Sequence, residues 1–323
     1  MKKFLLILLI AISFIYSKQV CAQTAMASVS SRHCISLNGK WNVLPDPTGS
    51  GNYREVWKER KAQKKTDFVE YSFEGGPLVN VPGDFNTQLP DAAYMEGTVW
   101  YKKTFSYSAK GKRLFLHFGA VNYLSDVYLN GEWIGAHEGG FTPFQFEISG
   151  KVKEGINTIV VKVNNQRRSD GIPGTGYDWL NYGGITRDVN LIETDPTFIE
   201  DYFIQLKKHS LTEVMGWVKL NGSQLSQKIH VKIPEMGIDY LIQSNGEGLA
   251  QVKLDGKFNL WSPANPKLYK VIVQSQTDTV VDEIGFRSIE TKGPQILLNG
   301  KPIFLKGVNI HEENPYKWAR ATS

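Results

Sequence analysis

Short runs rich in Val, Ile, Tyr and Phe recur along most of this chain, and each is broken after a few residues by Gly, Asn, Asp or Pro. Such runs predict β-strands joined by turns. Asn130-Gly131 and Asn299-Gly300 predict tight hairpins, because this pair tolerates the positive φ angles of a type I′ turn. Pro302 cannot donate a ladder hydrogen bond, which favours an edge or a short hairpin at the second site. No convincing amphipathic helix precedes the last residues, so the chain is predicted to be mainly β.

Residues 1–22 are predicted to be a secretory signal peptide. Lys2 and Lys3 form the basic start, residues 4–16 the apolar run and residues 20–22 a small-residue cleavage site. The alternative is a membrane anchor, but the run is too short to span a bilayer comfortably and no other segment is apolar enough to do so. A lipid anchor on Cys21 lacks the usual residues before the cysteine. We therefore expect export to a periplasmic or extracellular location, without a membrane span.

Burial, not covalent cross-linking, has to stabilise the mature chain. Only Cys34 would survive removal of the leader, which excludes an internal disulfide and a cysteine-based metal cluster. Loss of the three leader lysines would reduce the formal net charge from +5 to +2, which is no basic footprint for nucleic acid. Aromatic residues make up 12 % of the chain, enough to fill two cores.

Loop length divides the chain into two sandwiches. In residues 30–195 long loops rich in Gly and aromatic residues join the strands, which is typical of a jelly roll. In residues 196–290 the strands follow faster with plainer turns, which is typical of an immunoglobulin-like β-sandwich. The strings TDP at 194–196 and TKGP at 291–294 are the natural joints. We expect each sandwich to hold its own core, with few contacts across the joint.

The string YDWLNYGG at 177–184 contains the first candidate binding residue. Asp178 lies between Tyr177 and Trp179, and a carboxylate framed by aromatic rings suits a sugar, whose hydroxyls meet the carboxylate and whose C–H faces meet the rings. The alternative is that the aromatic side chains plug the end of a sandwich while Asp178 caps a turn. Composition alone favours this plainer alternative.

A second candidate lies near the C-terminus. If residues 303–308 form a strand, His311 and Glu312 follow its carboxyl end, where parallel strands present polar groups to a pocket. His311 could bind a ligand or a metal, and the alternative is a structural hydrogen-bonding residue. The sequence contains no GxSxG, HExxH or GxGxxG motif and no phosphate loop. Hydride, phosphoryl and serine-hydrolase chemistry therefore have no support, and we predict neither a cofactor nor a metal.

Nine strings, taken in order along the chain, resemble glycoside hydrolase family 2, the β-galactosidases and β-glucuronidases. They are LNGKWNV, VPGDFN, GTVWYKKTF, FGAVNYLSDVYLNGEWIGAHEGGFTPF, NTIVVKVNN, YDWLNYGGITRDVNLI, LWSPANPKLYKV, EIGFRSIET and LLNGKPIFLKGVNIHEENP. Several are long and specific, and their order is collinear with the family. The resemblance covers nearly the whole mature chain.

The resemblance implies a jelly-roll sugar-binding domain, an immunoglobulin-like domain and then a TIM barrel with the active site. Residues 291–323 would be the start of this barrel, a fold that needs roughly 250 residues. Asp178 matches the family's substrate-binding aspartate, and His311 matches the histidine after the first barrel strand, with Glu312 beside it. Thr98 stands where members often have a sugar-contacting Asn, and Ile310 replaces a common Arg. Both departures weaken any assignment of the sugar.

The family's two catalytic glutamates come from later barrel strands, so the resemblance transfers no catalytic residue to this chain. Retaining hydrolysis needs two carboxyl groups roughly 5 Å apart. Glu312 and Glu313 cannot substitute, because adjacent residues on an extended chain point to opposite faces. We therefore expect a fragment of an exported retaining β-glycosidase whose partner is a terminal β-linked sugar of a glycan. The alternative is a non-catalytic carbohydrate-binding or scaffold protein, and homo-oligomerisation of the complete protein stays open.

Overall fold

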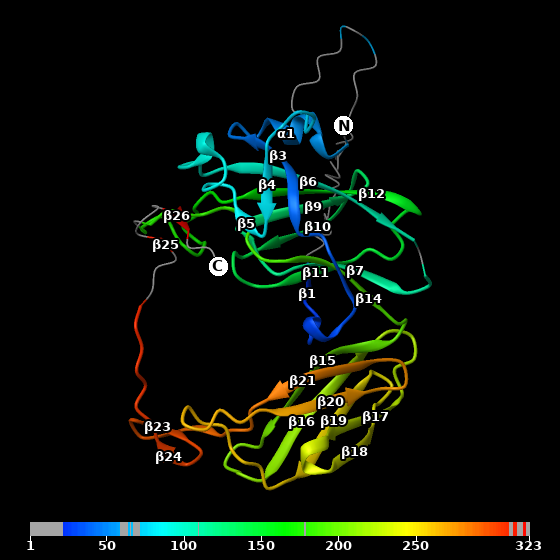
Figure 1. Ribbon diagram of the computed structural model, residues 1–323, viewed down its shortest axis with the longest axis vertical. Helices are drawn as coiled ribbons and strands as arrows, with labels where there is room; N and C mark the ends of the chain where they lie inside the picture. Colours follow the sequence, from blue (N-terminus) through cyan, green and yellow to red (C-terminus); the bar gives the residue numbers. More distant parts are fainter. Residues whose placement is uncertain are drawn as a thin grey trace, which may run out of the picture.

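Two β-sandwiches follow one another along the chain in the computed structural model, one above the other in Figure 1. The structure describes residues 22–58, 64, 66, 72–108, 110–177, 179–309, 313–314 and 319–320. Helices are few and short: α1 (Ser50–Arg54), η1 (Val29–Ser31), η2 (Val56–Lys58), η3 (Pro90–Ala92) and η4 (Pro234–Met236). The predicted mainly-β fold, a jelly roll followed by an immunoglobulin-like sandwich, is confirmed. Among the described residues no helix is long and apolar enough to cross a membrane.

The first sandwich consists of two large antiparallel sheets and one small one. The six-stranded sheet has the order β10 (Glu132–Glu138), β9 (Leu124–Leu129), β12 (Gly155–Asn164), β6 (Thr98–Tyr107), β3 (Gly39–Asp46) and β4 (Leu78–Val81). The five-stranded sheet has the order β1 (Gln23–Thr24), β11 (Phe144–Glu147), β7 (Arg113–Phe118), β14 (Val189–Thr194) and β2 (Cys34–Ser36). The small sheet has the order β5 (Gly83–Asp84), β13 (Gly184–Ile185) and β8 (Val121–Asn122).

The core of the first sandwich lies between its two large sheets. Alternate residues of each strand point inward, since successive side chains of a strand face opposite sides of the sheet. Trp41 and Val43 of β3 are fully buried and belong to one apolar cluster with Leu116 and Phe118 of β7. Burial of a large apolar side chain contributes about 1.5–3 kcal/mol. This cluster, rather than any cross-link, therefore holds the two sheets together.

The outer face of the six-stranded sheet is covered by the segment that contains α1 and η2. Trp57 stacks on Tyr128, with ring centroids 4.6 Å apart, and on Trp100 at 5.7 Å. The indole N–H of Trp100 donates to the buried carboxylate of Asp46 at 3.0 Å, and the backbone N–H of Gly51 donates to the same oxygen at 2.9 Å. The segment thus buries the part of this outer face around Trp100 and Tyr128.

The second sandwich pairs a three-stranded with a four-stranded antiparallel sheet. The first has the order β15 (Phe198–Leu206), β16 (Glu213–Asn221) and β19 (Leu249–Asp255). The second has the order β18 (Ile238–Gln243), β17 (Lys228–Ile233), β20 (Tyr269–Gln274) and β21 (Thr279–Ile284). The strands alternate: Val214, Val218 and Val231 are fully buried in a separate apolar cluster. Each sandwich therefore has a core of its own.

Both predicted Asn-Gly hairpins are confirmed. Asn130 and Gly131 have φ angles of 53° and 84° between β9 and β10. Asn299 and Gly300, with φ of 53° and 77°, join β23 (Gln295–Leu298) to the two-residue edge strand β24 (Lys301–Pro302). Strand β22 (Ile289–Lys292) pairs with β23 across the TKGP turn, so the predicted boundary at residues 290–291 falls within this small sheet.

The predicted strand at residues 303–308 is wrong. The backbone N–H of Ile303 still donates to the carbonyl of Ile296 in β23 at 2.9 Å, but residues 304–308 leave the second sandwich as an extended segment that belongs to no sheet of the described residues (Figure 1). Phe304 and Val308 are each 83 % exposed. A parallel barrel strand is stable only between neighbouring strands, because its backbone polar groups otherwise lack partners. Beyond it, β25 (Glu313–Asn314) pairs with β26 (Ala319–Arg320).

Phe198, the first residue of β15, is the centre of the junction between the sandwiches. It is 1 % exposed and packs in one cluster with Met26, Phe115 and Ile192 of the first sandwich. The guanidinium of Arg113 lies 5.1 Å from the Phe198 ring and also binds Glu147 in two parallel contacts of 2.7 and 2.9 Å. The pKa of Glu147 lies below its ordinary value, mainly because Arg113 donates hydrogen bonds to its carboxylate.

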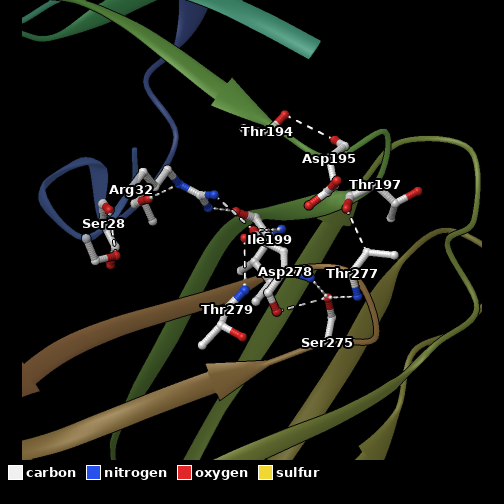
Figure 2. A network of polar contacts seen from close by, with 12 residues as sticks. Ser28, Arg32, Thr194, Asp195, Thr197, Ile199, Ser275, Thr277, Asp278 and Thr279 are labelled. Atoms are coloured by element: carbon white, nitrogen blue, oxygen red, sulfur yellow. Dashed lines mark hydrogen bonds and ion pairs between the residues drawn. The ribbon is translucent and has the colours of Figure 1, made fainter. Parts of the chain in front are cut away.

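The N-terminal segment 22–33 crosses this junction and binds both sandwiches. Strand β1 pairs with β11 of the first sandwich. Figure 2 shows Arg32 reaching into the second sandwich, where it forms an ion pair of 2.9 Å with Asp278 and donates to the carbonyl of Ile199 at 2.5 Å. The hydroxyl of Thr277 donates to the carbonyl of Thr197 at 2.7 Å. The expectation of few contacts at the joint is therefore wrong, because side chains far apart in sequence converge there.

Arg32→Ala should lower the free energy of unfolding by about 3 kcal/mol. The Asp278 carboxylate and the Ile199 carbonyl would each lose a buried partner, since the Arg32 and Asp278 side chains are only 4 % and 16 % exposed. Urea unfolding would measure the loss. Lys58→Ala is the matched control: its ion pair with Glu55 is 48 % and 29 % exposed, and its loss should cost less than about 0.5 kcal/mol. Equal effects of the two changes would contradict the role given to Arg32.

Candidate functional site

The loop of residues 165–183 lies at one end of the first sandwich. It follows β12, which ends at Asn164, and returns to the small sheet at β13. Pro173 and the glycines at 171, 174 and 176 interrupt any regular pairing, so the segment runs over the surface. Its tip is exposed, whereas Asn165 and Asn181 at its two ends are buried. The loop is therefore open to solvent at its tip and fixed at its base.

Two asparagines close the base of this loop. The amide of Asn165 donates to the backbone carbonyl of Asn181 at 2.5 Å, and the amide of Asn181 donates back to the carbonyl of Asn165. The side-chain oxygen of Asn165 also accepts from the backbone N–H of Gly97 at 2.9 Å. A buried carbonyl or amide without a partner costs about 1–3 kcal/mol, so these side chains replace the missing sheet hydrogen bonds.

Two further asparagines join the loop base to neighbouring segments. Asn86 accepts from the backbone N–H of Gly183 at 2.8 Å and donates to the carbonyl of Ala92 at 2.8 Å. Asn122 donates to the carbonyl of Tyr182 at 2.6 Å and to the side-chain oxygen of Asn181 at 3.0 Å. We call these four residues, Asn86, Asn122, Asn165 and Asn181, the asparagine network. Sequence reasoning missed it, although the strings NN at 164–165 and NYGG at 181–184 were visible.

Gly183 and Gly184 allow the backbone to pass between the asparagine network and the small sheet. A Cβ on Gly183 would lie 2.5 Å from the ring of Phe85, and one on Gly184 would lie 2.7 Å from the carbonyl oxygen of Gly83. Gly184 also has φ of 144°, which favours glycine. Burial beside Asp84 raises the pKa of Tyr101, which lies against Gly184. The hydroxyl of Tyr101 therefore stays neutral in this buried corner.

Two aromatic residues lie at the tip of the loop, and one arginine binds the backbone carbonyls of both. Tyr177 is 48 % exposed, and its ring centroid lies 4.3 Å from that of Trp179 at an interplanar angle of 47°. Arg167 donates to the carbonyl of Tyr177 at 2.7 Å and to the carbonyl of Trp179. Its Nε lies 3.0 Å from a carboxylate oxygen of Glu96. An exposed ring against a half-buried one, beside ionic groups, suits binding of a ring that has both apolar and hydroxyl-bearing faces.

A second group of charges lies beside the loop. Arg168 forms an ion pair of 2.8 Å with Asp170 and lies 3.9 Å from the Glu138 carboxylate. The hydroxyl of Tyr123 donates to Glu138 at 3.4 Å. These contacts are exposed, and none of them is made to the carbonyl of Tyr177 or Trp179. Among the described residues no three His, Cys, Asp or Glu side chains converge in a way that could hold a metal ion.

Of the four predicted substrate-binding residues, Asp178, His311 and Glu312 lie outside the described residues. Their predicted roles therefore stay predictions. Thr98 begins β6 and is 5 % exposed. Its hydroxyl accepts a hydrogen bond from Asn164 at 3.3 Å, and the neighbouring Gly97 is bound by Asn165. Thr98 is thus part of the framework directly under the loop base, and its contact with a sugar stays a prediction.

The jelly roll with its glycine-rich aromatic loop and the immunoglobulin-like sandwich correspond to two successive family descriptions. The family description "Glycosyl hydrolases family 2, sugar binding domain" matches residues 34–195. The description "Glycosyl hydrolases family 2" matches residues 197–287. The chain belongs to glycosyl hydrolase family 2.

Relatives in this family include enzymes named for two different sugars. The chain is 32 % identical over 311 residues to the β-galactosidase of Thermoanaerobacter pseudethanolicus, and the alignment covers 88 % of this chain and 39 % of that protein. It is 27 % identical over 315 residues to the β-glucuronidase of Paenibacillus borealis, which covers 88 % of this chain and 50 % of that protein. The chain thus spans half the length or less of these relatives.

Solved structures share the fold over almost the whole chain. The β-glucuronidase of Bifidobacterium dentium, complexed with coumarin-3-O-glucuronide, superposes with a TM-score of 0.78 at 23 % identity, over 94 % of this chain and 55 % of that one. The β-glucuronidase of Lactobacillus rhamnosus superposes with a TM-score of 0.72 at 29 % identity, over 94 % and 52 %. The two-sandwich arrangement is therefore common to this chain and these proteins.

Gly183→Ala should destabilise the protein by about 1–3 kcal/mol, because the new Cβ would lie 2.5 Å from the buried Phe85 ring and 2.6 Å from the Cβ of Asn165. Gly176→Ala is the matched control in the same loop, where a Cβ would meet nothing within 4 Å; its effect should stay within about 0.5 kcal/mol. Thermal unfolding of both variants measures the difference. If the two variants had the same melting temperature, the loop base would be able to accommodate the Cβ at residue 183 despite its close contacts.

Proposed function

We propose that this chain is the N-terminal part of an exported retaining β-glycosidase that removes terminal β-galactoside or β-glucuronide units from glycans. The observation that carries the proposal is the succession of the two family matches, over residues 34–195 and 197–287, on the two sandwiches in the order of the family. The relatives named above are β-galactosidases and β-glucuronidases, which supports a sugar of one of these two kinds.

The first sandwich would contribute substrate contacts, not bond cleavage. Asp178 would bind a sugar hydroxyl from the loop tip, with His311 and Glu312 forming one wall of the same pocket and Thr98 beneath it. The catalytic carboxyl pair of a retaining enzyme, roughly 5 Å apart, would come from barrel strands beyond residue 323. The proposal includes a leader at residues 1–22, which would direct export to a periplasmic or extracellular location. It also includes the start of the barrel at residues 291–323.

The alternative is a carbohydrate-binding or scaffold protein that has the two sandwiches and no catalysis. Its support is that the two described sandwiches each have a core of their own and that the first matches the description of a sugar binding domain. The coding sequence directly downstream separates the two functions. An in-frame or frameshifted continuation with barrel character would support the glycosidase, and its absence would support the binding protein.

The chain of 323 residues should hydrolyse neither chromogenic β-galactoside nor chromogenic β-glucuronide. The reason is that no residue of the chain matches the family's catalytic glutamates, and a retaining mechanism needs both. The assay compares purified protein with the same preparation from a host that carries an empty vector. Turnover that copurifies with the chain and is absent from the control would contradict this account.

In the complete protein, Asp178→Ala should reduce kcat/KM by the equivalent of roughly 2–4 kcal/mol and barely change the melting temperature. Loss of a charged hydrogen bond to the reacting sugar has a cost of this size. A turn-capping aspartate would instead lose about 1 kcal/mol of folding free energy and leave the kinetics alone. Both quantities are measured on the same variant. A lower melting temperature with unchanged kcat/KM would assign Asp178 a structural role.

A further inference from the structure

Arg167 connects three parts of the loop end that the sequence does not place together. Its backbone N–H donates to Glu96 at 3.3 Å, and its guanidinium lies 3.0 Å from the same carboxylate through Nε. The two terminal nitrogens donate to the carbonyls of Tyr177 and Trp179. A guanidinium has a planar, fixed fork of donors, so one side chain can hold two carbonyls and a carboxylate in one geometry.

Glu96 anchors Arg167 to a part of the loop base whose backbone is held by hydrogen bonds. The residues on either side of Glu96 are bound by the asparagine network: the carbonyl of Met95 accepts from Asn86 at 3.0 Å, and the N–H of Gly97 donates to Asn165 at 2.9 Å. The Arg167 side chain is 17 % exposed and that of Glu96 is 36 % exposed. The pair therefore lies at the boundary between the buried base and the solvent-exposed loop tip, where it can transmit the position of the base.

The two carbonyls that Arg167 binds belong to Tyr177, whose ring is exposed, and to Trp179, whose side chain is half-buried against it. Fixing both peptide groups fixes the directions in which the Tyr177 and Trp179 side chains leave the backbone. A loop with Pro173 and three glycines has many accessible conformations, and ordering one residue costs about 1–2 kcal/mol. Without the arginine, a ligand would have to supply this ordering when it binds, and its affinity would fall accordingly.

We propose that Arg167, braced by Glu96, is a positioning residue that holds the Tyr177–Trp179 ring pair as a preformed platform for the apolar face of a pyranose. The inference rests on the proposed function, since it names how the same loop recognises its sugar. Pyranose rings present axial C–H groups to an aromatic face, while hydroxyls at the ring edge reach polar groups nearby. The exposed Tyr177 ring and its contact with Trp179 offer such a face.

The test uses the 323-residue chain labelled with 5-fluorotryptophan, so that each of its eight tryptophans gives a fluorine resonance. Trp179→Phe assigns the resonance of Trp179. Methyl β-D-galactopyranoside and methyl β-D-glucuronide are each titrated to about 100 mM, because a single aromatic platform supports affinities near the millimolar range. We expect the Trp179 resonance to shift and saturate with one of the two glycosides.

Arg167→Lys keeps the charge and the possibility of an ion pair with Glu96 but cannot hold two carbonyls at once. It should weaken the glycoside roughly tenfold, with an unchanged melting temperature. Glu96→Gln should act in the same direction with a smaller effect. Arg168→Lys is the matched control, because Arg168 binds Asp170 and Glu138 instead of the loop carbonyls. In the absence of sugar, Arg167→Lys should also speed hydrogen exchange at residues 176–180, and Arg168→Lys should not.

The outcomes separate the two proposals. A glycoside that binds, as seen by calorimetry, without moving the Trp179 resonance would overturn the platform and leave the proposed function intact. Unchanged affinity and exchange in Arg167→Lys would overturn the positioning role alone. Equal losses in the Arg167 and Arg168 variants would also overturn it, because a general charge effect would then suffice. No response to either glycoside by any measurement would overturn both the platform and a carbohydrate-binding role for this chain.

Discussion

The reciprocal amide hydrogen bonds between Asn165 and Asn181 are the constraint on which the loop end of the first sandwich depends. A long loop that returns into a buried sheet carries backbone polar groups away from water, and each needs a partner. The asparagine network supplies these partners from side chains. Because Asn86 and Asn122 bind the same stretch, the positions of four segments become interdependent. The exposed tip can vary in sequence without loosening the fold beneath it.

The same requirement for partners explains the junction between the sandwiches. Phe198 is buried between the ring of Phe115 and the guanidinium of Arg113, and Arg32 closes the other side through Asp278. Cys34 is the only cysteine in the described part of the chain and its thiol is free, so no disulfide cross-links the described residues of the junction. An aromatic ring enclosed by two bound arginines resists rotation about the short connection at residues 195–197. The two sandwiches are therefore joined by side chains of both, not by the chain connection alone.

Local signals were predictable from the sequence, and non-local ones were not. The hairpins at Asn130 and Asn299 follow from φ angles that two adjacent residues determine by themselves. The asparagine network joins residues as far apart as Asn86 and Gly183, 97 positions away, so no local pattern announces it. The error at residues 303–308 has the same origin, because an apolar run becomes a parallel strand only when neighbours elsewhere in the chain pair with it. The role of Arg167 was likewise not predictable, since two of its partners are backbone carbonyls, which any residue provides, and the third, Glu96, lies 71 positions away.

Under the proposed function, the distribution of contacts also bears on where sugar choice would be encoded. β-Galactosidases and β-glucuronidases both occur among the relatives, so similar sequences over this part of the chain occur in enzymes of both names. Their cores and the asparagine network fix where a loop tip stands, and these features are indifferent to the hydroxyl pattern of a ligand. Arg167 and Glu96 lie one step outward, between that framework and the rings of Tyr177 and Trp179. Under the proposed platform, a change at Arg167 or Glu96 would alter the ring directions without disturbing the core, so that sugar preference would change at small cost in stability.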